Sequence, residues 1–85
     1  MSVAIQIRYF ASLREVLGAA ESVDHRPGLT LGQLREALVA RGGAHAELLA
    51  RGRAIRCALD QVMVDEGAAV HDGAEVAFFP PVTGG

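Results

Sequence analysis

Eighty-five residues suffice for one domain with a single hydrophobic core and leave little room for a deep pocket as well. The apolar content of 51% and charged content of 21% are typical of a globular chain, and a net charge of −2 without a basic stripe excludes nucleic acid as an expected partner. The chain has no apolar stretch that would span a membrane and one cysteine, Cys57, so we expect a cytoplasmic protein without internal disulfides.

The first part of the chain predicts a strand, a short helix and a second strand. Residues 3–10 alternate between two sets of side chains, which predicts a half-buried strand. Residues 11–17 predict the helix, and Ser12 and Glu15 have the spacing of a capping box at its start. Residues 21–26 predict a weaker strand, and the Pro-Gly pair that follows predicts a turn.

The next helix has the clearest signals in the chain. Thr30 is its predicted N-cap, Gln33 completes a capping box, and Gly42-Gly43 is expected to end it. The predicted apolar face consists of Leu31, Leu34, Ala37 and Leu38.

The second half of the chain predicts three short strands. Residues 55–59 and 62–64 flank a tight turn, and residues 75–79 form the last strand, which two prolines end. If the first and last strands pair, they lie parallel at the sheet centre, with the main helix across them. We therefore predict an α+β fold of the β-grasp type: a mixed sheet with helices on one face over residues 1–79, followed by a flexible tail over residues 80–85.

Three large apolar residues have the parity of the solvent-facing side of this sheet. Phe10 and Phe79 share the parity of the polar residues in their strands. In the short strand after the tight turn, Val62 is expected to point inward with Val64, which leaves Met63 outward. A single exposed apolar residue is normal, but three that converge would make a docking surface with aromatic and Met anchors.

The tail reads Pro80-Pro81-Val82-Thr83-Gly84-Gly85. Two prolines are stiff and extended, whereas two glycines allow the backbone to approach another molecule closely. Extended, the tail would reach about 20 Å. A stiff stem with a thin tip suits the insertion of a terminal carboxylate into a narrow active site of another protein. Gly-Gly alone would be weak evidence, since chain ends are usually uninformative; its weight comes from the strand and the prolines before it.

The C-terminal run EVAFFPPVTGG, residues 75–85, resembles the signature of the small subunit of molybdopterin synthase, the MoaD family of the MoaD/ThiS superfamily of sulfur carriers. Residues 8–15, RYFASLRE, resemble the first strand and helix of that family. The resemblance extends over essentially the whole chain, although the middle matches loosely. It implies a ubiquitin-like β-grasp fold.

The resemblance also implies a mechanism. An E1-like enzyme would use ATP to adenylate the carboxylate of Gly85, and a sulfurtransferase system would convert it to a thiocarboxylate. The tail would then enter the large catalytic subunit (MoaE family), in a heterotetramer of two small and two large subunits, and donate sulfur to cyclic pyranopterin monophosphate in molybdenum cofactor biosynthesis. Catalytic side chains would lie on the large subunit, and only Gly85, with Gly84 giving access, would react. The implied partner contacts are Phe10, Met63, Phe79, Pro80, Pro81, Val82 and Thr83.

Two alternatives share the fold and the Gly-Gly end. One is a ubiquitin-like protein modifier that is joined to lysines of targets. The other is a thiamine-pathway sulfur carrier, although such carriers usually lack the Phe-Phe-Pro-Pro run. No bound cofactor or metal is expected, because the histidines are scattered and no Cys or His stands at ligand spacing. Cys57 has the parity of Ile55 and Leu59, which favours a place in the core over a catalytic role.

Overall fold

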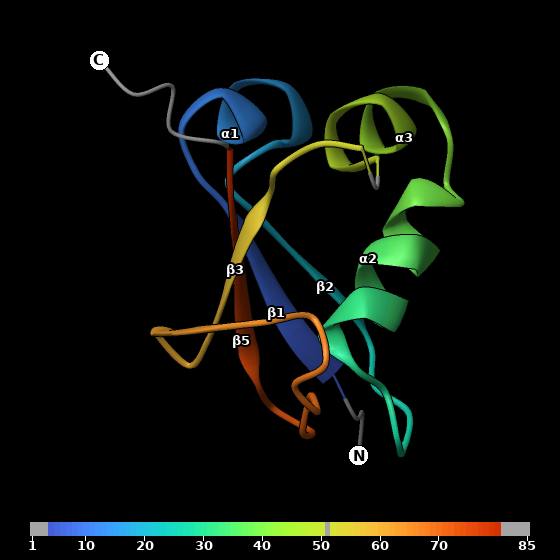
Figure 1. Ribbon diagram of the computed structural model, residues 1–85, viewed down its shortest axis with the longest axis vertical. Coiled ribbons are helices and arrows are strands. Elements are labelled where there is room, and N and C mark those ends of the chain that lie inside the picture. The colour runs from blue at the N-terminus through green and yellow to red at the C-terminus, as the bar shows by residue number, and fades with distance from the viewer. Residues whose placement is uncertain (1–3, 51, 81–85) are drawn as a thin grey trace.

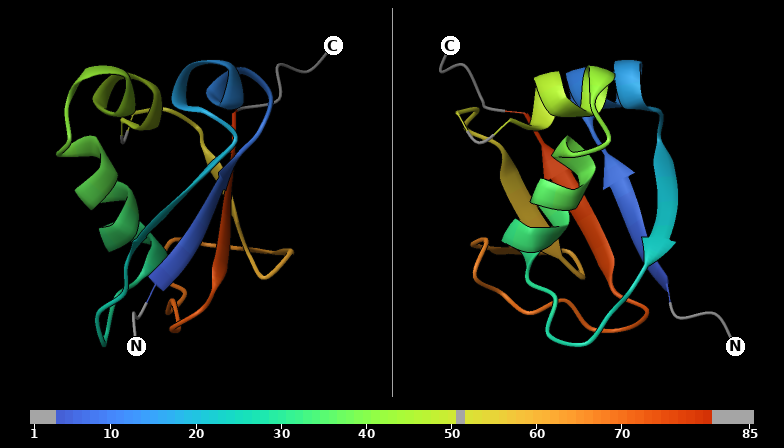
Figure 2. Two further views of the ribbon diagram at one scale, coloured as in Figure 1. Left: turned by 180° about the vertical axis from the view of Figure 1, so that it is seen from behind. Right: turned by 90° about the vertical axis from the view of Figure 1, so that its right-hand side faces the viewer.

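The computed structural model describes residues 4–50 and 52–80, which form a five-stranded sheet with helices on one face (Figures 1 and 2). In chain order the elements are β1 (Ala4–Tyr9), α1 (Ala11–Leu17), β2 (Ala20–Asp24), α2 (Leu31–Val39), α3 (Gly43–Leu49), β3 (Arg56–Leu59), β4 (Val62–Val64) and β5 (Glu75–Phe79). The strand order is β2-β1-β5-β3-β4, with β1 and β5 parallel at the centre and the other neighbours antiparallel. The predicted β-grasp arrangement is confirmed.

The core lies between the sheet and the helices. In β1 the odd-numbered side chains Ile5, Ile7 and Tyr9 are almost completely buried, and in β5 Val76 and Phe78 are fully buried. This alternation is the one that the sequence predicts for strands with one covered face. In the part of the chain that the structure describes, no helix is both long enough and apolar enough to cross a membrane.

The start of α2 agrees with the prediction, but its end and its buried face do not. The Gln33 N–H donates to Thr30 Oγ1 at 3.2 Å and the Thr30 N–H donates to Gln33 Oε1 at 3.1 Å, which completes the capping box. The helix ends at Val39, before the glycine pair, and Gly42 instead precedes α3 as its N-cap.

The predicted place of Ala37 in the apolar face is wrong, because Ala37 is exposed. The residue that completes the buried stripe with Leu31, Leu34 and Leu38 is Arg35. These four positions have the spacing i, i+3, i+4 and i+7, which is one face of a helix, whereas Ala37 lies beside that face.

One further expectation is corrected, and another holds only for the direction of a side chain. Helix α1 begins at Ala11 with Phe10 as N-cap and without a side-chain cap, so Ser12 already lies inside the first turn and makes no capping box with Glu15. Val62 is 62% exposed. Its register with Leu59 places it on the helix side of the sheet, as expected, but β4 is the outermost strand, so little covers that side chain.

Candidate functional site

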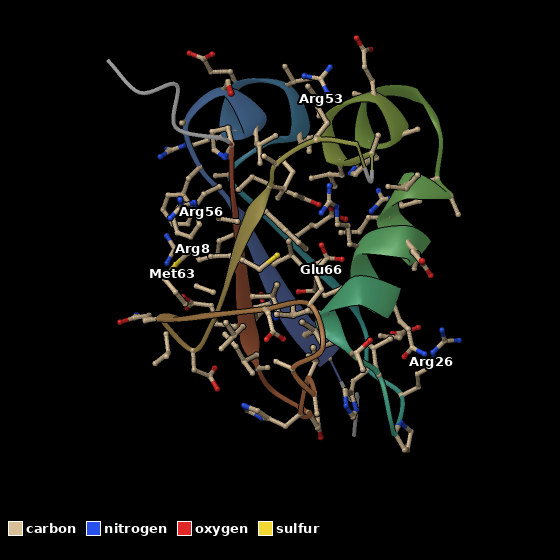
Figure 3. The ribbon with its side chains drawn as sticks, in the orientation of Figure 1. Arg8, Arg26, Arg53, Arg56, Met63 and Glu66 are labelled. Carbon is tan, nitrogen blue, oxygen red and sulfur yellow. The ribbon has the colours of Figure 1, made fainter. Side chains whose placement is uncertain are left out.

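The face of the sheet that carries no helices holds the residues predicted for docking. Across four strands the register aligns Arg8 of β1, Ala77 of β5, Ala58 of β3 and Met63 of β4 in one row. In the next row Phe79 lies opposite Arg56. Figure 3 shows Arg8, Arg56 and Met63 projecting from the same side of the sheet, away from the helices.

Phe10 and Phe79 are in direct contact on this face. Their ring centroids are 4.7 Å apart and the ring planes differ by 13°, which is a stacked pair. Both side chains are half-buried. The pair forms because Phe10 directly follows β1 while Phe79 ends β5, and the Phe10 N–H donates to the Phe78 carbonyl at 3.2 Å. The chain then turns sharply at Ala11, whose φ of 53° is left-handed.

Two alanines lie between the larger side chains. Ala58 is 3% and Ala77 is 6% exposed, although they pair with each other on the face of the sheet that carries no helices. The side chains long enough to cover them are their neighbours in the same and the next row, among them Arg8 and Met63. Met63 is itself 54% exposed. We name the surface made by Arg8, Phe10, Arg56, Ala58, Met63, Ala77 and Phe79 the docking face.

Arginine is a component of the docking face that the sequence analysis did not assign. Arg8 and Arg56 are exposed, and the Arg8 Cζ lies 5.9 Å from the centroid of the Phe10 ring, which is a cation–π distance. The parity that Arg8 shares with Phe10 was the available signal. The sequence contains no such signal for Arg56, because its place beside Phe79 depends on pairing between strands that are far apart in the sequence. The face is apolar with cationic groups, which suits a partner with apolar and acidic residues.

The tail is attached at the edge of this face. Pro80 follows Phe79 directly and is half-buried. Residues 81–85, which include the predicted Pro81, Val82, Thr83, Gly84 and Gly85, lie outside the described residues. The structure therefore brings Phe10 and Phe79 together next to the start of the tail, with Met63 across β3 from them. Their role as partner contacts stays a prediction.

Beyond the docking face, the far end of β5 is held by a charged pair. Asp60 accepts a hydrogen bond from the Glu75 N–H at 3.0 Å and lies 2.5 Å from His71 Nε2. The Glu75 N–H first, and His71 second, hold the pKa of Asp60 below its ordinary value. The Asp60 carboxylate raises the pKa of His71. This pair ties the β3–β4 turn to the start of β5.

Cys57 is not a candidate sulfur acceptor. Its side chain lies in the core and is 3% exposed, as the sequence predicted. Burial first, and the nearby charge of Glu66 second, raise the pKa of the thiol to about 11. The reactive thiolate is therefore scarce at neutral pH. In the described ranges no three His, Cys, Asp or Glu side chains are grouped so that they would hold a metal ion.

Arg35 is a structural residue that sequence reasoning missed. It is 2% exposed, and its guanidinium donates to the carbonyl oxygens of Leu49, Ala50 and Arg53 at 2.7, 2.5 and 2.9 Å. It also pairs with Glu66 at 2.8 Å. These bonds fix the segment between α3 and β3, and hence the strand that presents Arg56 and Ala58. The only indication of this role in the sequence was a charged residue at a position of the apolar stripe of α2.

Comparison with known proteins decides the family. The model of the ThiS family matches residues 7–85. The chain belongs to the ThiS family. It is 35% identical over 81 residues to the molybdopterin synthase sulfur carrier subunit of Haemophilus influenzae and 36% identical over 81 residues to that of Escherichia coli K12, with 95% of this chain and 99% of each relative covered. The crystal structure of Haloferax volcanii small archaeal modifier protein 1 is similar, with a TM-score of 0.75, 30% identity, and 94% and 99% of the two chains covered.

The match to the ThiS family includes both parts of the candidate site. It begins at Ile7, within β1, and so contains Arg8 and Phe10. It runs to Gly85 and so contains the whole predicted tail. The docking face and the tail of this ThiS-family chain therefore both lie within the stretch that the family model matches.

Proposed function

We propose that this protein is the sulfur-carrier small subunit of a molybdopterin synthase and that the carboxylate of Gly85 is its working group. The observation that carries the proposal is the near-full-length similarity to two relatives named as molybdopterin synthase sulfur carrier subunits. The Gly84-Gly85 end, which follows two prolines and the last strand of the domain, supports it chemically.

The chemistry begins with activation of the carboxylate. A carboxylate does not react with nucleophiles, whereas the acyl-adenylate that an E1-like enzyme makes from it and ATP carries AMP as a good leaving group. A sulfur nucleophile delivered by a sulfurtransferase displaces AMP and leaves a thiocarboxylate on Gly85. The large subunit then receives the tail and directs this sulfur to cyclic pyranopterin monophosphate, in the cytoplasm. Glycine suits the last position because no side chain hinders access to the carbonyl.

The docking face would seat this protein on the large subunit, in a heterotetramer of two small and two large subunits. Phe10, Phe79 and Met63 supply apolar anchors of the kinds enriched in interfaces, and Arg8 and Arg56 supply charge. Because the tail begins at Pro80, next to Phe79, docking through this face would also aim the tail into the partner.

A ubiquitin-like modifier is the second candidate, favoured by the 30% identity to small archaeal modifier protein 1. Both functions begin with adenylation of Gly85, so they differ only in what attacks the activated carbonyl afterwards. A carrier returns as the free carboxylate, whereas a modifier stays attached to a target amine through an amide bond.

The experiment follows the intact mass of the protein. Incubation with an E1-like enzyme, ATP and a sulfur source should replace one oxygen of Gly85 by sulfur. After addition of a MoaE-type subunit and cyclic pyranopterin monophosphate, molybdopterin should form and the original mass should return. Deletion of Gly85 should abolish both steps and leave the thermal midpoint nearly unchanged, since the hydrophobic core of the described residues is formed by side chains between Ile5 and Phe78. Amide linkage of Gly85 to other proteins, with no sulfur on the pterin, would establish the modifier instead.

A further inference from the structure

Strand β2 forms one edge of the sheet, and half of its backbone groups face away from β1. The Tyr9 N–H donates to the Ala19 carbonyl at 3.0 Å, so these opposite residues form a hydrogen-bonded pair. Such pairs alternate along an antiparallel ladder, which makes Glu21 and Val23 the residues of β2 that bond to β1. The residues whose N–H and C=O groups face outward are therefore Ala20, Ser22 and Asp24. An edge of this kind is a template for another strand.

A groove of about 280 Å³ lies beside this edge, between β2 and α2. Its apolar wall consists of Val23, Leu29, Leu34, Ala37 and Leu38. The volume is below that of sites that enclose a whole small molecule and suits one or two side chains of a longer chain. A strand paired with β2 would place its side chain opposite Val23 over this groove, because alternate side chains of a strand share one face. The open edge and the groove therefore fit one extended segment.

Charges of both signs line the groove, with a carboxylate on Asp24 and guanidinium groups on Arg26 and Arg41. Arg41 lines it and is paired with Glu21 at 2.5 Å, whereas Arg26 is exposed and makes no ion pair within residues 4–50 and 52–80. Figure 3 shows Arg26 beside the lower part of α2, on the other side of the molecule from Arg8 and Met63. An acidic side chain at one end of a bound segment would complement Arg26.

We propose that the outer edge of β2 binds an extended segment of a partner protein, with alternate apolar side chains in the groove and an acidic residue at Arg26. Main-chain bonds to the outward residues would supply affinity, and the groove would supply specificity. The site goes beyond the proposed sulfur transfer and is separate from it. Since the docking face lies on another side of the sheet, both surfaces can be occupied at once.

A second copy of this chain fits the edge less well. If two β2 strands paired antiparallel about Ser22, Glu21 of the second copy would lie opposite Val23 and over the apolar groove. That carboxylate already accepts hydrogen bonds from Tyr9 at 2.7 Å and Arg41 at 2.5 Å. Moving it toward apolar side chains would break these bonds and leave a charge without solvation.

The test uses two synthetic peptides, Ac-Thr-Val-Thr-Val-Thr-Glu-Asp-NH2 and Ac-Asp-Glu-Thr-Val-Thr-Val-Thr-NH2, which cover both strand directions. One of them, titrated into the full-length ¹⁵N-labelled protein, should shift amide signals of β2 and α2 in a saturable manner. The amide protons of Ser22 and Asp24 should become protected from exchange on binding, whereas that of Val23 is protected already. Lys in place of the two acidic residues should weaken binding.

Variants separate the parts of the site. Ala37→Gln fills the groove from an exposed helix position and should abolish binding. Ser22→Pro removes an outward N–H at an edge where proline is tolerated, and it should therefore weaken binding of the peptide. Arg26→Glu should weaken binding about fivefold, as for an exposed ion pair, while the matched reversal Arg14→Glu on α1 should not. Thermal midpoints check that each variant folds, and sulfur transfer should be unaffected by Ala37→Gln.

The proposal is overturned if neither peptide binds, if the shifts map to the docking face around Met63, or if Ala37→Gln binds like the unaltered protein. It is also overturned if the protein alone dimerises through β2 in sedimentation experiments, because the edge would then belong to a second copy.

Discussion

Phe79→Ala should weaken association with the large subunit more than it weakens the fold. Phe79 is half-buried on the open face, so its removal leaves a surface hollow that water enters rather than a sealed cavity, and the ~3–5 kcal/mol typical of a core Phe is not expected. The main loss is the stack on Phe10 at 4.7 Å, worth ~0.5–1.5 kcal/mol, together with some buried area. We therefore expect a fall of about 1–2 kcal/mol in the free energy of unfolding.

In the complex the same side chain would be fully buried as an interface anchor. Truncating an anchor of this kind costs ~2–4 kcal/mol of binding, which corresponds to roughly 30-fold to 1,000-fold in Kd. Urea unfolding of the isolated protein measures the first quantity, and calorimetric titration with a MoaE-type subunit measures the second.

Val62→Ala is the matched control. Val62 is 62% exposed and neighbours Met63 in β4, but its register with Leu59 turns it to the helix side of the sheet. Its truncation should leave the Kd unchanged. If Phe79→Ala lowered the unfolding free energy by ~4 kcal/mol while binding was unaltered, Phe79 would be a structural residue and the docking face would be wrongly placed. Equal losses of affinity in both variants would show that binding does not depend on this face.

Arg35→Ala should lower the free energy of unfolding by about 3–5 kcal/mol in urea, since it removes the donor to the carbonyls of Leu49, Ala50 and Arg53 and one ion-pair partner of Glu66; a loss below ~1 kcal/mol would contradict the role assigned to these bonds. The raised pKa of His71 and the lowered pKa of Asp60 make their pair most stabilising between the ordinary values of 3.8 and 6.5. The thermal midpoint of His71→Gln should therefore fall below that of the unaltered protein at pH 5.5, and the difference should vanish as the pH rises through the raised pKa of His71; a constant difference from pH 5 to 9 refutes this. Replacing Arg8 and Arg56 by Glu should weaken large-subunit binding, more at low salt than at high salt; an unchanged Kd would remove charge from the docking argument.

Local sequence signals predicted the features that depend only on residues close together in the chain. Thr30 and Gln33 make the predicted capping box because both partners lie within one helical turn. Asp60 and Gln61 form the predicted turn, with φ of 49° and 70°, between strands that pair directly. The outward parity of Phe10 and Phe79 could likewise be read from the residues beside them. The Gly-Gly end is a property of the sequence alone.

The tertiary structure decided which of these residues meet. Arg35 is buried because three carbonyls and Glu66, from other segments, converge on one position of α2. Arg56 joins the docking face only through the register of β3 against β5. The groove beside Ala37 exists because α2 stands next to an unpaired edge of the sheet. The sequence determined the chemistry that each element carries, whereas long-range pairing set the surfaces on which it is presented, because those contacts join residues that share no local pattern.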